Sequence, residues 1–356
     1  MAKVFPARLF PAALCLPLAA LLAAPAAAKE EAGAPPLTLD LVNAAVPAEG
    51  AAREPEKRPA RAPERPDPLV LRTQVLLDRA RFSPGAIDGR EGDNYRRALA
   101  AYAVSQGLGG TERLTPELFA KLRGAGGDPA LVAYTITEAD LAGPFTATIP
   151  RRMEDQADLG ALGYRTPREM LAERFHMRPE LLDVLNPDKP FDRAGTVVTV
   201  AGVAPMGTDK PKELPQAPKV ARVAVEKESR AVRAFDKDDR LVAYYPASIG
   251  SEEKPAPSGR AKVKGVAFNP SYTYDPKYRF AGVKAKTKFS IKPGPNNPVG
   301  LVWIDLSILS YGIHGTPEPD KIGKTESHGC IRLTNWDARD LAAHVAPGTK
   351  VSFEER

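Results

Sequence analysis

The 356-residue sequence predicts a multidomain protein with a small helical domain, a small α+β unit and a mainly-β C-terminal domain that has one late helix. Three observations predict this organisation. Apolar residues recur at helical spacing from residue 69, apolar and polar residues alternate from residue 221, and proline-rich stretches precede the first and last of these parts. A hydrophobic content of 43% suits two or three small domains and is too low for a membrane protein.

Residues 1–28 are predicted to be an export signal. Lys3 and Arg8 give a positive start, an apolar run follows from Leu9 to Leu22, and Ala26-Ala27-Ala28 is an A-x-A cleavage signal. Because the run contains prolines and is shorter than the roughly 20 residues that span a bilayer, we expect export to the periplasm or cell envelope and no stable membrane span after the leader is removed. Lipidation of Cys15 is the alternative, but the residues before it lack the small residue expected next to a lipidated cysteine.

Residues 29–68 are predicted to be a disordered linker. They consist of alanine, proline and alternating charges without an apolar period, so they cannot bury enough surface to offset their chain entropy. The chain as a whole has a formal charge of +6. Since an exported protein does not meet nucleic acid, we expect anionic envelope polymers as partners and no nucleic acid; a simple aid to solubility is the alternative.

The segment 69–124 is predicted to be a small helical domain. Leu71, Val75 and Leu76 recur at helical spacing, a loop with glycines follows, and residues 95–104 repeat the apolar period. Three short motifs stand out: Gln74-Val75-Leu76-Leu77, Pro84-Gly85-Ala86-Ile87-Asp88-Gly89 and Leu114-Thr115-Pro116-Glu117-Leu118. With these motifs the segment resembles the three-helix peptidoglycan-binding module of wall enzymes. A helical domain that only packs on its neighbour is the alternative.

Residues 133–202 are predicted to form a strand, two helices and a closing strand. The expected elements are a strand at 164–166, helices at 168–175 and 179–185, and a strand at 195–200. The segments Leu171–Phe175 and Leu182–Asn186 fall where the LysM glycan-binding motif has its two helices, so the unit resembles a degenerate LysM. Arg165-Thr166-Pro167-Arg168-Glu169 replaces the usual Gly-Asp-Thr, which leaves its affinity for glycan open. Residues 203–219, rich in proline and lysine, are predicted to be a linker.

The C-terminal domain, residues 220–356, is predicted to be mainly β, because its apolar residues alternate between charged turns. The expected strands are 221–225, 231–235, 241–248, 263–268 and 301–306. The aliphatic run Leu301–Ile304 is expected to be buried on both faces. The late helix, 336–345, is expected to begin at a cap supplied by Thr334 or Asn335.

Cys330 is the candidate nucleophile. It is the only cysteine beyond the leader, and in an oxidising compartment a thiol without a disulfide partner is a liability unless its reactivity is used. A free thiol with a pKa near 8.5 is only about 3% thiolate at pH 7, and a nearby imidazole raises that fraction. His314, expected at the end of a strand, is the candidate base. Gly315 and Gly329 are expected to let the chain turn sharply beside these two residues.

The two motifs around these residues carry a specific resemblance. Ile313-His314-Gly315-Thr316, then Ile322-Gly323, then Ser327-His328-Gly329-Cys330-Ile331-Arg332-Leu333 with Asp337 are similar to the signature of L,D-transpeptidase catalytic domains of the YkuD type. Pro255–Gly259 takes the place of that family's Thr-Pro-x-Gly turn, with alanine and serine departures, and Asn297–Gly300 fits the segment before its central strand. The resemblance implies a mainly-β, sandwich-like catalytic fold.

The resemblance also implies roles for single residues. Cys330 would be the nucleophile, His314 the proton donor and acceptor, and the carbonyl of Gly315 the group that orients the imidazole. The amides of Gly329 and Cys330 would stabilise an oxyanion. Ser327, His328, Arg332 and Tyr311 would line the substrate site, with Tyr311 adding a hydroxyl. For His328 a purely structural role is an equal alternative, and for Arg332 we expect pairing with Asp337 rather than with a substrate carboxylate.

The implied reaction is a two-step acyl transfer on peptidoglycan. Cys330 would attack a tetrapeptide stem, release the terminal D-alanine and pass the acyl group to an amine, without any cofactor. A stem amine would give a 3-3 crosslink, an outer-membrane protein amine would give tethering, and water would give trimming. An L,D-carboxypeptidase or endopeptidase, and a non-catalytic peptidoglycan-binding protein, are the alternatives. A zinc site is disfavoured, because His328 and Cys330 are too closely spaced for a usual ligand pair.

Overall fold

The computed structural model describes residues 36–48, 65–127, 129–207, 219–250, 255–278, 283–325 and 329–355. The predicted leader with Cys15, most of the predicted linker 29–68, and the site residues Ser327 and His328 lie outside these ranges. Within them, no helix has both the length and the apolar character needed to cross a membrane.

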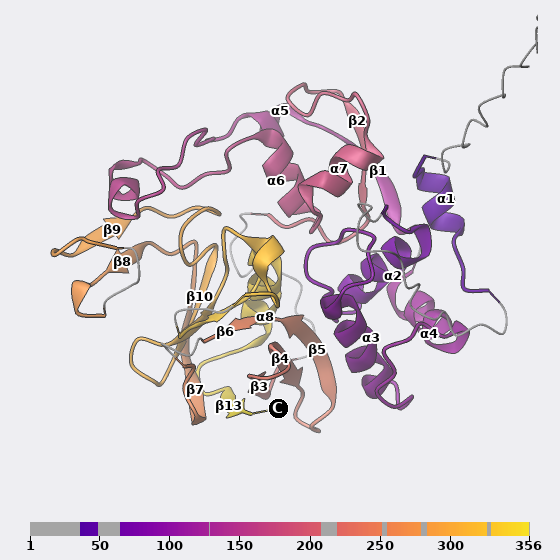
Figure 1. Cartoon of the computed structure of the whole chain (residues 1–356). Coiled ribbons are helices and arrows are strands. Elements are labelled where there is room, and N and C mark those ends of the chain that lie inside the picture. Colours follow the sequence, from indigo (N-terminus) through magenta and orange to yellow (C-terminus); the bar gives the residue numbers. More distant parts are fainter. Residues whose placement is uncertain are drawn as a thin grey trace, which may run out of the picture. The chain divides into compact units, whose positions relative to one another are not determined.

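The C-terminal domain is built on strands that alternate as the sequence predicts (Figure 1). Its strands are β3 (Arg222–Glu226), β4 (Ala231–Phe235), β5 (Leu241–Pro246), β6 (Ser248–Ile249), β7 (Gly259–Phe268), β8 (Tyr272–Tyr274), β9 (Phe289–Ile291), β10 (Val302–Leu306), β11 (Gly312–His314), β12 (Ile331–Arg332) and β13 (Lys350–Glu354). Among the described residues, nine of them form one sheet in the order β5-β4-β3-β13-β7-β10-β11-β12-β6, and β8 pairs with β9 in a separate hairpin.

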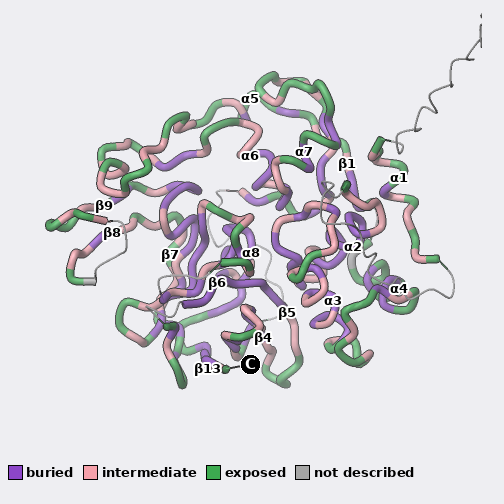
Figure 2. Tube along the Cα trace, viewed as in Figure 1, coloured by how far each residue is buried: buried purple, intermediate pink, exposed green. Residues whose placement is uncertain are grey.

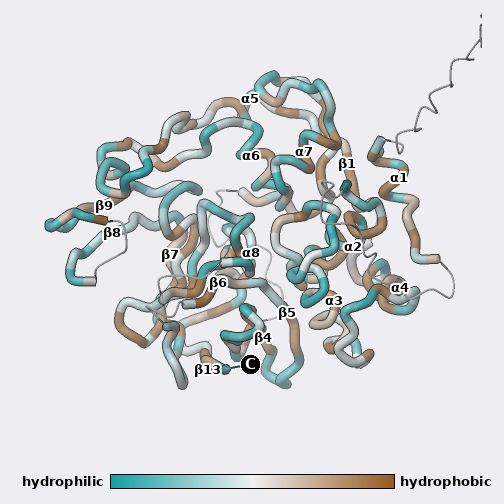
Figure 3. Tube along the Cα trace, viewed as in Figure 1, coloured by the Kyte–Doolittle hydropathy of each residue, from teal (hydrophilic) through white to brown (hydrophobic). Residues whose placement is uncertain are grey.

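The long strand β7 joins the two halves of the sheet. Its first residues, Gly259–Lys262, pair with β13, and Val263–Phe268 pair with β10. One apolar core follows from this arrangement, with buried residues from both halves such as Val225, Ile304 and Ile331. In Figure 2, strands such as β5 and β6 are largely buried, whereas most of β7 is exposed or half-buried; in Figure 3 the hydrophobic stretches follow strands such as β5. The domain is therefore mainly β and sandwich-like, as expected.

The late helix α8 (Asn335–His344) packs on β10 and β11. Thr334 caps it, since its hydroxyl accepts a hydrogen bond from the Asp337 N–H at 3.1 Å. The expectation that Leu301–Ile304 is buried on both faces is wrong. Val302 and Ile304 are fully buried, but Trp303 lies on the opposite face of β10 and is only partly buried, because strand residues alternate between faces.

The helical domain consists of three helices around a core. They are α2 (Pro68–Arg79), α3 (Asp93–Ser105) and α4 (Pro116–Gly126). Their core includes Leu76, Leu99 and Leu118, and it also takes in Ala231 and Tyr244 from the β domain. The helical domain and the C-terminal domain thus share buried surface.

The prediction of disorder throughout 29–68 is wrong for the helix α1 (Leu39–Ala44). Thr38 caps this helix by accepting from the Leu41 N–H, and Val42 is fully buried. The Asn43 side chain exchanges two hydrogen bonds with the backbone of Leu131, at 2.8 and 3.0 Å. The burial of Val42 and the hydrogen bonds of Asn43 to Leu131 are contacts with distant residues, which amino-acid composition does not predict.

The α+β unit contains two strands and two main helices. They are β1 (Leu131–Thr135), α6 (Pro167–Arg174), α7 (Pro179–Leu185) and β2 (Val197–Ala201), with a short helix α5 (Glu138–Leu141) and a 3-10 turn η1 (Glu154–Asp158) between β1 and α6. The predicted strand at 164–166 is wrong. The strand that pairs with β2 is β1, and Thr166 instead caps α6. The missed pairing is long-range, so local sequence does not indicate it.

The segment between α5 and α6 packs on the C-terminal domain near β9. The Leu162 N–H donates to Pro293 O, and Leu162 O accepts from the Asn296 N–H, both at 3.0 Å. The start of the predicted linker 203–219 is also packed, since Val203 and Met206 are buried and Met206 clusters with Trp336 and Leu301. Residues 203–207 are therefore not a linker, and residues 208–218 lie outside the described ranges.

The N-terminal parts contact α8 through polar and aromatic side chains. Arg81 pairs with Asp340 at 2.9 Å, and the Ser83 hydroxyl donates to Asp337 at 3.0 Å. His176 stacks on Trp336 with ring centroids 5.1 Å apart, and its Nδ1 lies 3.0 Å from a carboxylate oxygen of Asp78. His176 therefore has a structural role at this contact.

Candidate active site

His314 is the last residue of β11 and is 4% exposed. Its Nδ1 lies 2.7 Å from the carbonyl oxygen of Gly315, which is the bond that the resemblance implies. A carbonyl oxygen only accepts, so Nδ1 carries the proton and Nε2 presents a lone pair. Burial, with the nearby charge of Arg332, lowers the pKa of His314 to about 3. The ring is therefore neutral at pH 7 and able to accept a proton at Nε2.

A tryptophan that the sequence analysis missed lies against this imidazole. Trp303 pairs with His314 across β10 and β11, and their rings stack with centroids 5.5 Å apart and planes 20° apart. A Cβ added to Gly312 would lie 2.5 Å from the indole. Gly312 thus leaves the space that the indole occupies. Local sequence does not mark Trp303, because the pairing of its strand with the histidine strand is a contact between separate segments.

Cys330 lies between Gly329 and the first residue of β12. Gly329 has a φ of +106°, a backbone conformation that favours glycine, as expected for a sharp turn beside Cys330. Cys330 is partly exposed, and its Sγ lies 3.9 Å from the carbonyl oxygen of Ser310. The sulfur is therefore in reach of solvent and of a substrate.

Strand pairing puts the thiol and the imidazole on one face of the sheet. β11 and β12 run parallel, with Ile313 opposite Ile331 and His314 opposite Arg332. The two isoleucines point into the core, so the alternate residues, Cys330 included, project from the other face. Cys330 immediately precedes β12, so the thiol lies beside the strand that pairs with the strand of His314.

Arg332 faces the site instead of pairing with Asp337 as predicted. Burial lowers the pKa of Arg332, and its charge interacts with Cys330, Glu318 and Tyr272. Asp337 contacts Ser83 from the helical domain, and burial raises the pKa of its carboxyl well above the ordinary range. The prediction failed because the partner of Asp337 comes from a distant part of the chain.

The tyrosine beside the thiol is Tyr272 of β8. Burial, and next the interaction with Cys330, raises the pKa of Tyr272 to about 12, so its hydroxyl keeps its proton. Tyr311, which was expected to supply a hydroxyl, lies in the turn before β11, where its backbone bonds Leu306 and Ile308. No local motif marks Tyr272, because β8 reaches the site only through tertiary structure.

The reason given for Gly315 also needs correction. A Cβ at this position would lie 2.1 Å from the side-chain oxygen of Asn335. Glycine is required there by the close approach of Asn335, not by a sharp turn toward substrate. Within the described ranges, no group of three or more His, Cys, Asp or Glu side chains is arranged to hold a metal ion.

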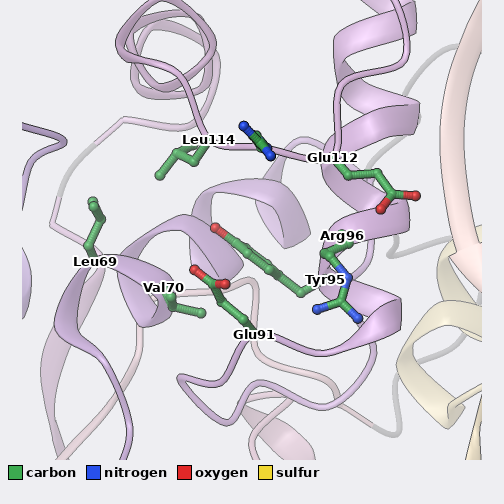
Figure 4. A pocket seen from close by; sticks show the side chains of 8 residues that line it. Leu69, Val70, Glu91, Tyr95, Arg96, Glu112 and Leu114 are labelled. Atoms are coloured by element: carbon green, nitrogen blue, oxygen red, sulfur yellow. The ribbon is translucent and has the colours of Figure 1, made fainter. Parts of the chain in front are cut away.

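Two pockets lie outside this site. One, of about 310 Å³, is in the helical domain (Figure 4), with Leu69, Val70 and Leu114 on one side of Tyr95 and Arg96 and Glu112 on the other. The other, of about 420 Å³, lies between the loop before α3 and the segment Pro319–Lys324 of the C-terminal domain.

The C-terminal domain thus carries a neutral histidine at the end of β11 and a partly exposed thiol just before β12, two groups suited to thiol chemistry. Residues 221–352 match the model of the L,D-transpeptidase catalytic domain, YkuD. This part of the chain is accordingly similar to L,D-transpeptidase catalytic domains.

Two curated proteins and one solved structure are among those to which this chain is similar. A Bacillus licheniformis protein named YkuD is 36% identical over 132 residues, which are 37% of this chain and 64% of that protein. The probable L,D-transpeptidase YcfS of Escherichia coli is 30% identical over 195 residues, 52% of this chain and 58% of the relative. The chain thus covers less than two thirds of either relative. L,D-transpeptidase 3 from Mycobacterium tuberculosis, with a faropenem-derived adduct, aligns over 46% of this chain and 75% of its own at 18% identity and a TM-score of 0.32.

Proposed function

We propose that the protein is a cysteine-dependent L,D-transpeptidase that acts on peptidoglycan stem peptides. The observation that carries this proposal is the state and position of His314. Its Nδ1–H donates to Gly315 O and its ring is neutral. Its strand, β11, pairs with β12, which begins directly after Cys330. A neutral imidazole with one nitrogen already bound is suited to accept a thiol proton at the other nitrogen.

The proposed reaction has two steps. Cys330 Sγ attacks the carbonyl of the third stem residue as its proton passes to His314 Nε2, and the tetrahedral intermediate collapses to a thioester. The bond to the terminal D-alanine breaks, and the departing amine takes the proton from His314. An acceptor amine then attacks the thioester, loses a proton to His314, and the proton returns to the released thiolate.

Other residues of the motif have supporting roles in the proposal. The amides of Gly329 and Cys330 stabilise the oxyanion, at about 3 kcal/mol for each donor. Arg332 supplies positive charge beside Cys330, which favours thiolate and attracts a substrate carboxylate. By family resemblance, Ser327 and His328 are proposed to contact the substrate.

We propose a stem amine as the acceptor, which gives a 3-3 crosslink in cell wall biogenesis. A protein amine of the outer membrane is the second acceptor considered, and water would make the enzyme a carboxypeptidase. Purified tetrapeptide stems distinguish these reactions by their products. Detection of trimmed tripeptide alone, with no dimer at high acceptor concentration, would refute the crosslinking assignment.

The helical domain is proposed to bind the wall polymer. Its pocket combines apolar walls from Leu69, Val70 and Leu114 with the charged side chains of Arg96 and Glu112 (Figure 4), a mixture that suits sugars and short peptides. Loss of wall pulldown in Arg96→Ala, with unchanged acylation, is the expected result. Glycan binding by the α+β unit and export to the periplasm belong to the same proposal.

The catalytic assignment is tested by intact mass after incubation with a carbapenem. We expect one adduct on the wild-type protein, none on Cys330→Ala, and a strongly slowed reaction of His314→Ala. If Cys330→Ala left the crosslink content of the wall unchanged while wall binding persisted, the protein would be a non-catalytic wall binder.

A further inference from the structure

Asn335, the first residue of α8, is fully buried against the turn that carries His314. Its Oδ1 accepts a hydrogen bond from the Leu301 N–H at 2.9 Å. A Cβ added to Gly315 would lie 2.1 Å from that oxygen, and one added to Gly300 would lie 2.0 Å from it. Both glycine backbones are therefore packed directly on the Asn335 amide. One of them, Gly315, provides the carbonyl that holds the imidazole of His314.

The other end of this amide is held by one acceptor from outside the catalytic domain and one from within it. Asn335 Nδ2 donates to Glu173 Oε1 at 2.6 Å and to Pro295 O at 3.2 Å. Glu173 lies on α6 of the α+β unit and is 7% exposed. With a donor facing Oδ1 and two acceptors facing Nδ2, the amide has one satisfied orientation. Glu173 is thus one of three groups that fix which way the Asn335 amide points.

The carboxyl of Glu173 is suited to such a buried contact. Burial, and to a smaller extent the neighbouring carboxylate of Glu169, raises its pKa to about 8, while the Asn335 bond acts in the opposite direction. At pH 7 the carboxyl is therefore mostly neutral, so no unpaired charge is buried at this contact. A neutral carboxyl still accepts from an amide N–H through its carbonyl oxygen.

We propose that Glu173 is a positioning residue for the transpeptidase site: through Asn335 it fixes the Gly315 carbonyl and hence the direction of His314 Nε2. This inference rests on the proposed function. Small displacements of a catalytic base are costly, since a misplacement of about 1 Å can slow a reaction about a hundredfold. The α+β unit then completes the catalytic site in addition to any role in wall binding.

The test uses the full chain and the kinetics of acylation by a carbapenem, resolved into a constant for non-covalent binding and a rate constant for acylation. Glu173→Met keeps the volume but removes the acceptor, and Glu173→Asp keeps the carboxyl but shortens its reach. We expect both to lower the acylation rate constant by about tenfold or more, with the binding constant unchanged. Glu173→Gln keeps an acceptor oxygen at the same reach and should restore most of the rate.

Ser83→Ala is the matched control. It removes a buried hydrogen bond to Asp337 on the same helix, but that bond does not touch the histidine turn. We expect Ser83→Ala to lose stability and keep the wild-type acylation rate constant. If Glu173→Met does not fold, Glu173→Asp and Glu173→Gln still give the comparison.

The outcomes separate this inference from the function on which it rests. A wild-type protein that is never acylated would refute the proposed function, and the positioning role with it. An acylated wild type with equally fast Glu173→Met and Glu173→Asp would refute only the positioning role. A slow Ser83→Ala, or a Glu173→Gln as slow as Glu173→Met, would also refute it, because the loss would then reflect general loosening of the packing on α8.

Discussion

The buried carboxyl of Glu173 is expected to lower the stability of this protein as the pH rises, and Glu173→Gln should remove this pH dependence. Its pKa is raised by burial from 4.5 to about 8 in the folded protein. An acid with a raised folded pKa binds its proton more tightly in the folded state than in the unfolded state. Its stabilising contribution is therefore complete below pH 4.5 and is lost as the pH rises through 8.

The magnitude follows from the two pKa values. A difference of 3.5 between 4.5 and about 8, at about 1.4 kcal/mol for each pH unit, gives a loss of roughly 4 to 5 kcal/mol once the pH exceeds 8. Glu173→Gln has no such titration. His314 acts at the other end of the scale: its pKa is lowered from 6.5 to about 3, so stability is lost as the pH falls from 6.5 toward 3. The loss of stability from His314 at low pH is the same in the wild type and in Glu173→Gln, so it cancels when the two are compared.

The assay is urea unfolding of the wild type and Glu173→Gln at intervals between pH 5 and pH 9. We expect the free energy of unfolding of the wild type to fall relative to that of Glu173→Gln by roughly 4 kcal/mol over this range. The exposed Glu228 supplies a control, since Glu228→Gln should follow the wild type. Parallel curves for the wild type and Glu173→Gln would refute the reasoning, because they would mean that the carboxyl titrates alike in folded and unfolded protein.

Three further substitutions test other parts of the structure. Gly315→Ala should lower the free energy of unfolding by about 1–3 kcal/mol and slow acylation, because its Cβ would meet Asn335; wild-type stability in chemical denaturation would contradict the packing described here. Trp303→Leu should slow acylation and raise the pKa of His314, followed by NMR titration of the ring, because the indole excludes water from the imidazole; an unchanged titration would show that the stacking is irrelevant. Val42→Ala should cost about 1–3 kcal/mol if α1 is docked, whereas a change below about 0.5 kcal/mol would mean that this segment is not part of the folded unit.

Local patterns predicted the elements whose cause is local. The alternation at 231–235 and 263–268 lies within β4 and β7, and that at 221–225 agrees with β3 to within one residue, since period two is a property of the strand itself. Thr334 was identified as a possible cap because capping needs only the next three residues. Family resemblance, not periodicity, indicated the bond between His314 and Gly315.

The structural features that local sequence patterns did not predict share one physical reason. The strand β1, the helix α1 and the partner of Asp337 all depend on contacts between segments far apart in the sequence. Leu301–Ile304 was misjudged for the same reason. Whether Trp303 lies in the core or against an imidazole depends on what covers that face of the sheet, and the sequence of the strand does not carry this information.

The sequence by itself indicated the class of chemistry, because Cys330 and His314 stand in two glycine-bearing motifs of a β domain. Only the tertiary structure decided the surroundings that give these groups their properties. The neutral state of His314, the approach of Tyr272 and the contact from Glu173 to Asn335 arise from burial and long-range packing. Burial changes the free energy of charges and hydrogen bonds, and which groups are buried together is a property of the folded chain as a whole.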